Sequence, residues 1–365
     1  MNEQGTKSVH SMSVEEAKKS GFFERMLLSR LGKMSSGSLL INKLDQVNVL
    51  GKSTGKGISA EIMVSNPVFF RKACLGGSLG VADSYADGDW NTPDLVKVFR
   101  LFLQNQEVMD AMESGWARIL NFLARFAYAL GKRNTLQGSR RNIALHYDLG
   151  NEFYESFLDR SMTYSCGIFE SPKHDLEQAS IAKYDRIIDQ LEIQDHHEVL
   201  EIGCGWGGFV QRFAQRCQAT LTATTISDNQ FEYTVKKIKA NRLEKRIKVI
   251  KLDYRNLKGK FDRIVSIEMI EAVGHEFLPT YFSKISELLH SDGAALIQGI
   301  TMPDNRYDKY LKEVDYIRTR VFPGSCVPSA SAMISAAVKN SDLRPTRLTD
   351  FCLLYTSDAA DDTPC

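Results

Sequence analysis

Apolar and polar positions alternate between two periods in the second half of the chain. From residue 199 onward, short apolar runs of strand length alternate with longer segments whose apolar residues recur every three or four positions. The expected strands are 199–203, 220–224, 247–252, 263–268 and 294–300, and the expected helices are 209–216, 229–241, 277–289 and 329–340. This alternation predicts an α/β fold with a mostly parallel sheet, whose ligand binds at the carboxyl ends of the strands. The expected ends, which should line one crevice, are Gly203, Thr224, Asp253, Glu268 and Ile300.

The first half of the chain has a different pattern and predicts separate domains. Residues 1–38 form a polar segment followed by a short amphipathic helix, and 39–113 form a small α+β domain. In that domain, strands are expected at 40–44 and 58–64, and helices at 67–74 and 93–103. A connecting helix occupies 114–145, the α/β domain runs over 146–351, and the remaining segment is 352–365.

The connecting helix is basic. It contains six Lys or Arg residues between Ser114 and Tyr147 and no Asp or Glu, while Ile119, Phe122 and Phe126 share one face. Such a helix can rest on an anionic lipid surface, where each basic group adds about 1 kcal/mol. It can equally be a connecting helix with one face on the core and a solvated basic back. No apolar run reaches the roughly 20 residues needed to span a bilayer, so any membrane contact is expected to be peripheral.

Composition narrows the remaining classes. The net charge of +1 gives no general electrostatic reason for nucleic-acid binding. Seven scattered cysteines, without a C-x-x-C pair or metal-ligand spacing, predict a reduced, cytoplasmic protein with no metal site. A homodimer remains open.

A glycine-rich turn is the strongest local signal. Residues 199–208 read Val-Leu-Glu-Ile-Gly-Cys-Gly-Trp-Gly-Gly, an apolar strand followed by glycines and then by a helix. Glycines let the main chain approach a ligand closely, and the helix start presents free N–H groups. Dinucleotide folds use a different glycine spacing and an acidic residue after the second strand. Here Glu201 precedes the glycines and the second strand has no acid at its tip, which favours S-adenosylmethionine over NAD.

Several ordered motifs together resemble the cyclopropane-fatty-acyl-phospholipid synthase family. They are His146-Tyr-Asp-Leu-Gly-Asn, Tyr164-Ser-Cys, Gly203-Cys-Gly-Trp-Gly-Gly, Thr225-Ile-Ser, Phe261-Asp-Arg-Ile-Val-Ser, Glu271-x-Val-Gly274 and Phe322-Pro-Gly-Ser-Cys-Val-Pro-Ser. The resemblance implies a Rossmann-like class I methyltransferase fold. It also implies transfer of a methylene unit from S-adenosylmethionine to the cis double bond of an acyl chain in a membrane phospholipid, through a carbocation that then loses a proton.

The resemblance also assigns site residues. The implied cofactor contacts are Tyr164, Ser165, Gly203, Cys204, Gly205, Thr225, Ile226, Gln230 and Tyr254, the last beside the adenine. The family's base is a bicarbonate ion held by a cysteine, a glutamate, a histidine, an isoleucine and a tyrosine. Cys166, Glu271 and Ile300 stand at the cysteine, glutamate and isoleucine positions, and Gln298 stands where the histidine is expected.

Two departures leave the product open. Gln298 can donate a hydrogen bond but cannot titrate, and Ala272 replaces another family histidine. A methyl-branched fatty acyl product, or methylation of a small amine, is therefore an alternative. After an expected strand at 345–351, the chain ends in a segment from Cys352 that matches nothing in the family and reads as foreign sequence. A truncated, non-catalytic lipid-binding fragment is the alternative of another class.

Overall fold

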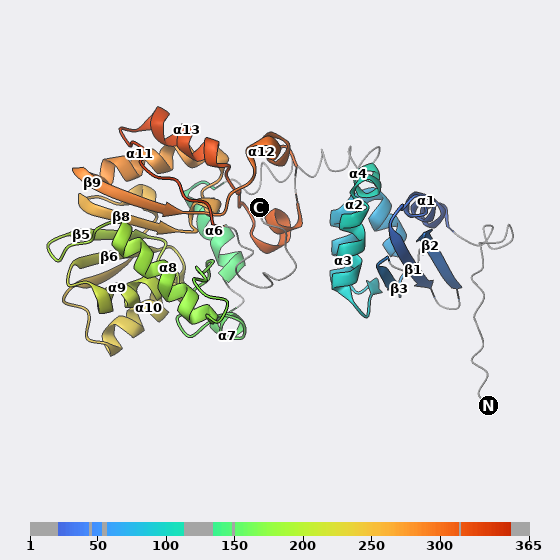
Figure 1. Ribbon diagram of the computed structural model, residues 1–365, viewed down its shortest axis with the longest axis horizontal. Coiled ribbons are helices and arrows are strands. Elements are labelled where there is room, and N and C mark those ends of the chain that lie inside the picture. Colours follow the sequence, from blue (N-terminus) through green and yellow to red (C-terminus); the bar gives the residue numbers. More distant parts are fainter. Residues whose placement is uncertain are drawn as a thin grey trace. The chain divides into compact units, whose positions relative to one another are not determined.

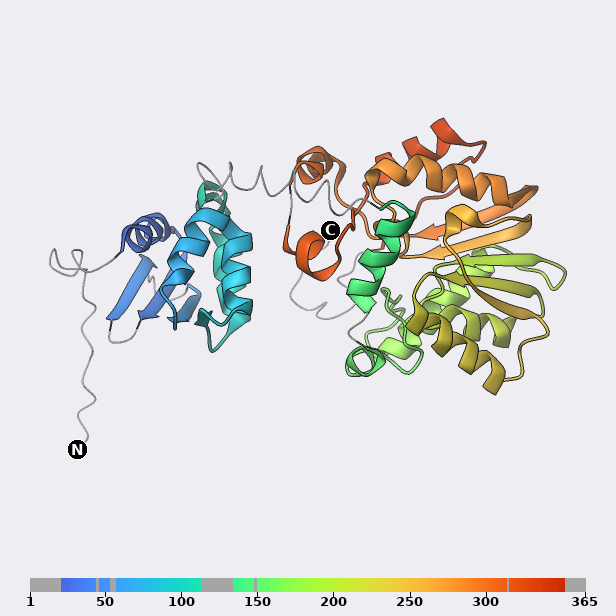
Figure 2. The same cartoon turned by 180° about the vertical axis from the view of Figure 1, so that it is seen from behind.

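The computed structural model describes residues 21–43, 46–52, 57–112, 134–147, 150–313 and 315–351. The chain divides into two compact units, residues 1–129 and 130–365, and each is considered by itself (Figures 1 and 2). Most of the basic connecting segment, including the apolar face at Ile119, Phe122 and Phe126, lies outside the described residues, as do residues 352–365.

The first unit is a four-stranded sheet with helices. Strand order is β2-β1-β3-β4, in which β1 pairs antiparallel with β2 and parallel with β3. Leu39, Ile41 and Ile62 are buried on the sheet and pack with apolar residues of the helices. The elements are α1 (Phe22–Leu31), β1 (Gly37–Lys43), β2 (Gln46–Lys52), β3 (Ser59–Val64), α2 (Val68–Ala86), β4 (Trp90–Asn91), α3 (Leu95–Gln104) and α4 (Gln106–Met112).

Two expectations for this unit need correction. The helix that begins at Val68 does not end near Cys74 but continues to Ala86, through a cluster of glycines. Gly77 has φ 57° and ψ −139°, so the helix kinks there and then resumes. Strand β2 was not predicted from the sequence. Its short sequence mixes apolar and polar residues, and its strand conformation depends on pairing with β1.

The second unit contains the expected parallel sheet. Its order is β7-β6-β5-β8-β9, with every neighbouring pair parallel. The strands are β5 (Glu198–Ile202), β6 (Thr220–Thr225), β7 (Ile247–Lys251), β8 (Phe261–Ile267) and β9 (Leu289–Gln298). The predicted α/β fold class is confirmed. Strand β9 starts five residues earlier than expected and ends at Gln298, so Ile300 lies beyond the strand.

Helices cover both faces of this sheet (Figure 1). On one face, α8 (Leu176–Gln190), α9 (Gly208–Arg216) and α10 (Asp228–Ala240) bury apolar side chains against Val199, Leu221 and Val265. On the other face, α11 (Leu278–Leu288) and α13 (Ala330–Asn340) pack against Leu200 and Ile264. Neighbouring residues of β5 thus enter different cores, as the two-residue period of a strand requires.

Shorter elements surround the carboxyl ends of the strands. They are α6 (Leu136–Tyr147), α7 (Asn151–Glu155), α12 (Asp304–Leu311), the 3₁₀ turns η2 (Tyr254–Asn256), η3 (Ile270–Ala272) and η4 (His275–Phe277), and the π-helical turn η5 (Ile317–Val321). The strand expected at 345–351 is wrong, since these residues have no regular structure.

The glycine turn gives a stability prediction. Gly207 has φ 78°, and a Cβ there would lie 2.8 Å from Thr234 Cγ2. Gly207→Ala should therefore destabilise the protein by about 2 kcal/mol more than Gly259→Ala, because the clash adds to the cost of a left-handed residue. Gly259 also has positive φ, but its Cβ would meet nothing closer than 3.8 Å. Urea unfolding of both variants measures the difference, and equal losses would contradict this packing.

The described residues contain neither a membrane-spanning helix nor a metal-binding cluster, and their cysteines form no disulfide. There, no helix has the length and apolarity needed to cross a bilayer, and no cluster of side chains suited to a metal ion occurs. The described cysteines are unpaired thiols, of which Cys166 is half-buried and the other four are buried: Cys74, Cys204, Cys217 and Cys326.

Candidate functional site

The loop between β5 and α9 shapes one wall of a pocket. Gly203 and Gly205 have φ of 84° and 52°, which favours glycine at both positions. The Gly203 and Cys204 amides donate to Thr224 O at 3.0 and 2.8 Å, which fixes the loop to the end of β6. A Cβ on Gly205 would meet nothing within 4 Å. The main chain at Gly205 is therefore open to a ligand that lies on the loop.

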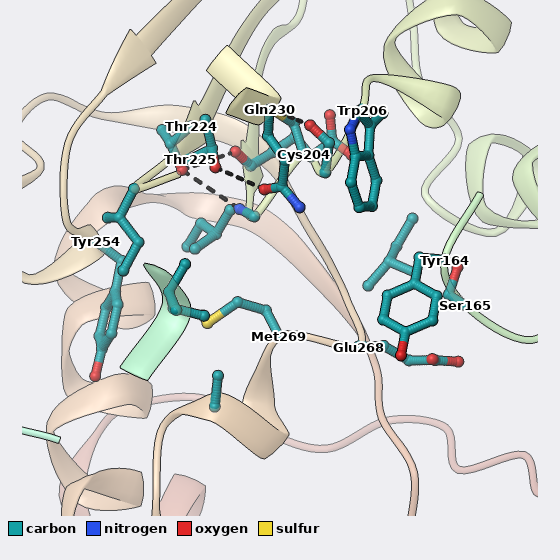
Figure 3. Close-up of a pocket in the computed structure, with 18 of the residues that line it drawn as sticks. Tyr164, Ser165, Cys204, Trp206, Thr224, Thr225, Gln230, Tyr254, Glu268 and Met269 are labelled. Atoms are coloured by element: carbon teal, nitrogen blue, oxygen red, sulfur yellow. Dashed lines mark hydrogen bonds between the residues drawn. The ribbon is translucent and has the colours of Figure 1, made fainter. Parts of the chain in front are cut away.

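The pocket gathers residues from several distant segments (Figure 3). All the expected cofactor contacts line it: Tyr164, Ser165, Gly203, Cys204, Gly205, Thr225, Ile226, Gln230 and Tyr254. Thr225 Oγ1 donates to Gln230 Oε1 at 2.9 Å, so these two side chains hold one another in place. Four of the five expected strand ends, Gly203, Thr224, Asp253 and Glu268, also line this pocket, and Ile300 does not.

A buried acid and a buried base lie beneath the loop. Glu201 is 2% exposed and lines the pocket, and its Oε2 has no hydrogen-bond partner among the described residues. Burial raises the pKa of Glu201 to about 8, although the charge of Lys183 opposes this shift. Lys183 is 1% exposed, and burial lowers its pKa to about 8. The Lys183 ammonium donates to Ser165 Oγ and lies 4.7 Å from the Tyr184 ring centroid.

Asn134 ties the entrance of the pocket together. Its Nδ2 donates to the carbonyls of Ala272 at 2.9 Å and Gly324 at 2.8 Å, and its own carbonyl accepts from Arg255 Nη1 at 2.8 Å. Arg255 in turn makes an ion pair of 2.7 Å with the buried carboxylate of Asp253. The segment before α6, the turn after β8 and the turn after β7 are thus joined through the side chain and the main-chain carbonyl of one residue, Asn134.

Aromatic rings form another wall. Tyr154 and Trp206 are buried with their ring centroids 4.6 Å apart, and Tyr164 lies 5.4 Å from Tyr154. Tyr164 is 42% exposed, so its ring faces the open side of this cluster. Its hydroxyl group lies on the same side of the pocket as Glu268 (Figure 3). A polarisable face therefore lies within the same cavity as the loop.

The expected catalytic residues form two clusters beside the pocket and do not line it themselves. In the first, Gln298 Nε2 lies 3.3 Å from Cys166 Sγ and donates to Glu268 Oε1 at 2.9 Å. Glu268 Oε1 also accepts from the Cys166 amide at 2.9 Å. Glu268, which does line the pocket, therefore connects Cys166 and Gln298 to the cavity. Its backbone is left-handed, with φ 47°.

The second cluster surrounds Glu271. This side chain is 5% exposed, one oxygen accepts from the Ile300 amide, and the other has no hydrogen-bond partner in the described chain. Burial raises the pKa of Glu271 to about 7. The Cys326 amide donates to the main-chain carbonyl of Glu271 at 2.8 Å. Cys166 and Glu271 thus lie in neighbouring but separate clusters.

These arrangements fit the two expected ligands unequally. A cationic donor fits, because the pocket has an open glycine loop and the unpartnered oxygen of Glu201. Bicarbonate does not fit as expected. The amides of Gln298 and Ile300, which would have to donate to that anion, already donate to Glu268 and Glu271. Two carboxylates next to a bound anion would also repel it.

Sequence reasoning missed the roles of three residues. Glu268 was predicted to end a strand but was assigned no role in the site. An acidic residue at the carboxyl end of a buried strand is itself an indication of a functional site. Lys183 lies in α8, and nothing in its local sequence indicates that it is buried. Asn134 lies outside every motif, and only the tertiary structure reveals its contacts.

A five-stranded parallel sheet with helices on both faces, and a glycine loop at the carboxyl end of its first strand, define a class I S-adenosylmethionine-dependent methyltransferase fold. The family model described as mycolic acid cyclopropane synthetase matches residues 134–358. The chain belongs to this family.

Two curated relatives are each 34% identical to the chain. Tuberculostearic acid methyltransferase UfaA1 of Mycobacterium tuberculosis aligns over 275 residues, 73% of this chain and 64% of its own. Cyclopropane-fatty-acyl-phospholipid synthase of Escherichia coli aligns over 278 residues, 74% of this chain and 67% of its own. The chain therefore spans about two thirds of the length of these relatives.

Solved structures agree with the fold. The cyclopropane synthase MmaA2 from Mycobacterium tuberculosis is 28% identical, with a TM-score of 0.51 over 55% of this chain and 74% of that one. Mycolic acid cyclopropane synthase CmaA1, complexed with SAH and CTAB, is 30% identical with the same TM-score and coverage. That structure contains the demethylated form of the expected donor.

Proposed function

We propose that this protein transfers a methylene unit from S-adenosylmethionine to the cis double bond of an unsaturated phospholipid acyl chain. The observation that carries the proposal is the pocket itself. It combines an open glycine loop, a buried carboxylate without a partner, and apolar side chains beside the loop. Membership in a family of cyclopropane synthases and fatty acyl methyltransferases supports the same chemistry.

The chain's own residues account for binding of the donor. Gly203 and Gly205 let the loop approach it, and Glu201 offers an acceptor to its ammonium group. Thr225 ends β6 and is held by Gln230 of α10, and Tyr254 offers a ring face just after β7. When bound, the donor supplies an electrophilic methyl group.

An alkene is a weak nucleophile, so the site must align it and exclude water. Met162, Met269 and Val273 line the pocket with apolar surface for an acyl chain. The Tyr164 ring, half-exposed in the same cavity, can stabilise positive charge on the chain after methyl transfer. Deprotonation of the methyl group then closes a ring, while deprotonation of an adjacent carbon leaves a methyl or methylene branch.

Contact with a membrane is part of the proposal, because the acyl substrate lies in a bilayer. In the first unit, α3 has three exposed apolar residues on one stripe: Val96 and Phe99 are each 60% exposed and Leu103 is 63% exposed. Such a stripe suits the boundary between headgroups and acyl chains.

Phe99→Asp should therefore reduce sedimentation with anionic vesicles about five-fold or more, because a charge would replace the exposed apolar ring that enters the membrane interface. Asp83→Asn, a change on another helix of the same unit, is the control. Unchanged sedimentation of Phe99→Asp would exclude α3 as a membrane contact, and donor binding by calorimetry should be the same in both variants.

The function is tested with isotopically labelled S-adenosylmethionine and vesicles of unsaturated phospholipid. The expected product is a lipid whose mass rises by one methylene unit and which has lost its double bond. A lipid with the added mass and a retained double bond would assign methyl branching instead. No labelled lipid in the presence of donor binding would refute the proposal, and labelled small amines would favour the N-methyltransferase alternative. Absence of donor binding would favour a non-catalytic lipid-binding fragment.

A further inference from the structure

Glu268 is held in an unusual conformation in the lining of the pocket. It follows the last residue of β8 and has φ 47°, a left-handed conformation that is uncommon for a residue with a side chain. Its amide donates to the Gln298 carbonyl at 2.8 Å, so the end of β9 fixes its backbone. Strained residues of this kind cluster at functional sites. Here the conformation turns a carboxylate into the pocket lining.

The Glu268 carboxylate accepts hydrogen bonds from the donors that would otherwise bind a free anion. Glu268 Oε1 accepts from the Cys166 amide and from Gln298 Nε2, both at 2.9 Å. These two hydrogen bonds fix its orientation. Cys166 and Gln298 are the residues whose positions the family resemblance assigned to bicarbonate. The anion site of this chain is therefore occupied by its own side chain.

We propose that Glu268 is the proton acceptor of the reaction and takes the place of bicarbonate. This inference rests on the proposed function. The π electrons of the alkene form a bond to the donor methyl carbon while the S–CH₃ bond breaks, and its electron pair stays on sulfur. A C–H bond of the transferred methyl group then breaks. Its proton goes to the Glu268 carboxylate, and its electron pair forms the second C–C bond of the ring. Glu268 later releases the proton to water.

Neighbouring charges suit this role. The ammonium of Lys183, buried on α8, interacts electrostatically with Glu268, so a cation compensates the negative charge close to the reaction. Burial, and next the charge of Glu268, raise the pKa of the Cys166 thiol to about 12, which keeps that thiol neutral. The same two causes raise the pKa of Tyr164. Of these groups, Glu268 is the one carboxylate that lines the pocket.

Glu271 is another carboxylate near the pocket, but it is poorly placed. It does not line the cavity, and one oxygen accepts from the Ile300 amide. Its hydrogen bond to the Ile300 amide instead stabilises the turn after β8.

Glu268→Gln tests the proposal, because glutamine keeps an oxygen acceptor for both hydrogen bonds but cannot take a proton. Turnover should fall at least about a hundred-fold, which is the usual contribution of a general base, while the donor Kd stays within about three-fold. Glu232→Gln, on the exposed face of α10, is the matched control and should keep wild-type turnover. Near-normal turnover of Glu268→Gln would overturn the proposal.

Removal of bicarbonate separates the two possible bases. Wild-type turnover in buffers freed of carbon dioxide should change by less than about two-fold, and added bicarbonate should not raise it. A strict requirement for bicarbonate, with lipid still being methylated, would overturn this inference and leave the proposed function standing. No methylated lipid under either condition would count against the proposed function itself.

Anion binding provides a test that does not depend on turnover. Glu268→Gly removes the carboxylate and leaves the Cys166 and Gln298 donors without it. Millimolar formate should then raise the melting temperature of Glu268→Gly and leave that of the wild type unchanged, because a ligand stabilises only the state that binds it. A shift in the wild type as large as in the variant would show that Glu268 does not occupy the anion site.

Discussion

Replacing Glu201 by glutamine is expected to weaken binding of S-adenosylmethionine roughly thirty- to hundred-fold above pH 8, where the carboxylate is ionised. The Glu201 carboxylate is buried and has an oxygen without a partner among the described residues. A charge-assisted hydrogen bond to the donor's ammonium group contributes about 2–3 kcal/mol in such a site. Calorimetric titration measures the loss directly. Glu198→Gln, an exposed acid on the same strand, is the control and should bind normally.

The same substitution should change how affinity depends on pH. Glu201 has a pKa of about 8 in the free protein, so at pH 6 or 7 it must lose a proton before it can pair with a cation. The ratio of wild-type to Glu201→Gln affinity should therefore rise roughly ten-fold per pH unit between 6 and 8, then level off. At pH 7, titrations in buffers of different ionisation enthalpy should count about one proton released from Glu201. A constant ratio would show that Glu201 does not pair with the donor.

Lys183→Met is expected to weaken donor binding at least about ten-fold while the protein stays folded. The charge of Lys183 opposes the rise in the Glu201 pKa, and the ammonium also holds Ser165 on the pocket wall. Without Lys183, the Glu201 pKa should rise further, and each unit costs ten-fold in affinity near pH 7. Methionine fills similar volume without a buried charge, so the free energy of unfolding should change little.

The stability of this variant has its own pH signature. The folded-state pKa of Lys183, about 8, lies below its ordinary value of 10.5. Wild-type stability should therefore fall as pH decreases from 10.5 through 8, and Lys183→Met should lack this decrease. Lys236→Met, at an exposed position on α10, should show wild-type behaviour in both measurements. Unfolding of Lys183→Met at pH 7 would show instead that the ammonium is needed for the fold, and normal donor affinity would contradict its role in binding.

The parallel sheet and the pocket could be predicted because they depend on local pattern. Apolar runs placed the five strands, and the carboxyl ends of parallel strands must lie together. Gly203, Thr224, Asp253 and Glu268 consequently line one pocket, as expected. Strand β9 ends at Gln298, so Ile300 is presented through its main-chain amide and not through its side chain.

The electrostatics of the site could not be predicted, because they depend on tertiary burial. Lys183 belongs to an ordinary amphipathic helix, and only its packing beside Ser165 and Tyr184 makes it an internal cation. Likewise, the bicarbonate expectation came from aligned motifs and could not show that Glu268 would reach the same donors. The left-handed backbone at Glu268 results from the pairing of strand ends across 30 residues of chain.

The buried cysteines give each unit an internal reporter of unfolding. Burial raises the pKa of every described thiol: Cys74, Cys166, Cys204, Cys217 and Cys326. Alkylating reagents attack the thiolate, so in the native state these positions react slowly at neutral pH. In a variant without Cys352 and Cys365, the labelling rate at Cys74 would follow opening of the first unit. The rate at Cys217 would follow opening of the methyltransferase unit, so one mass spectrum taken over time could rank the stabilities of the two units.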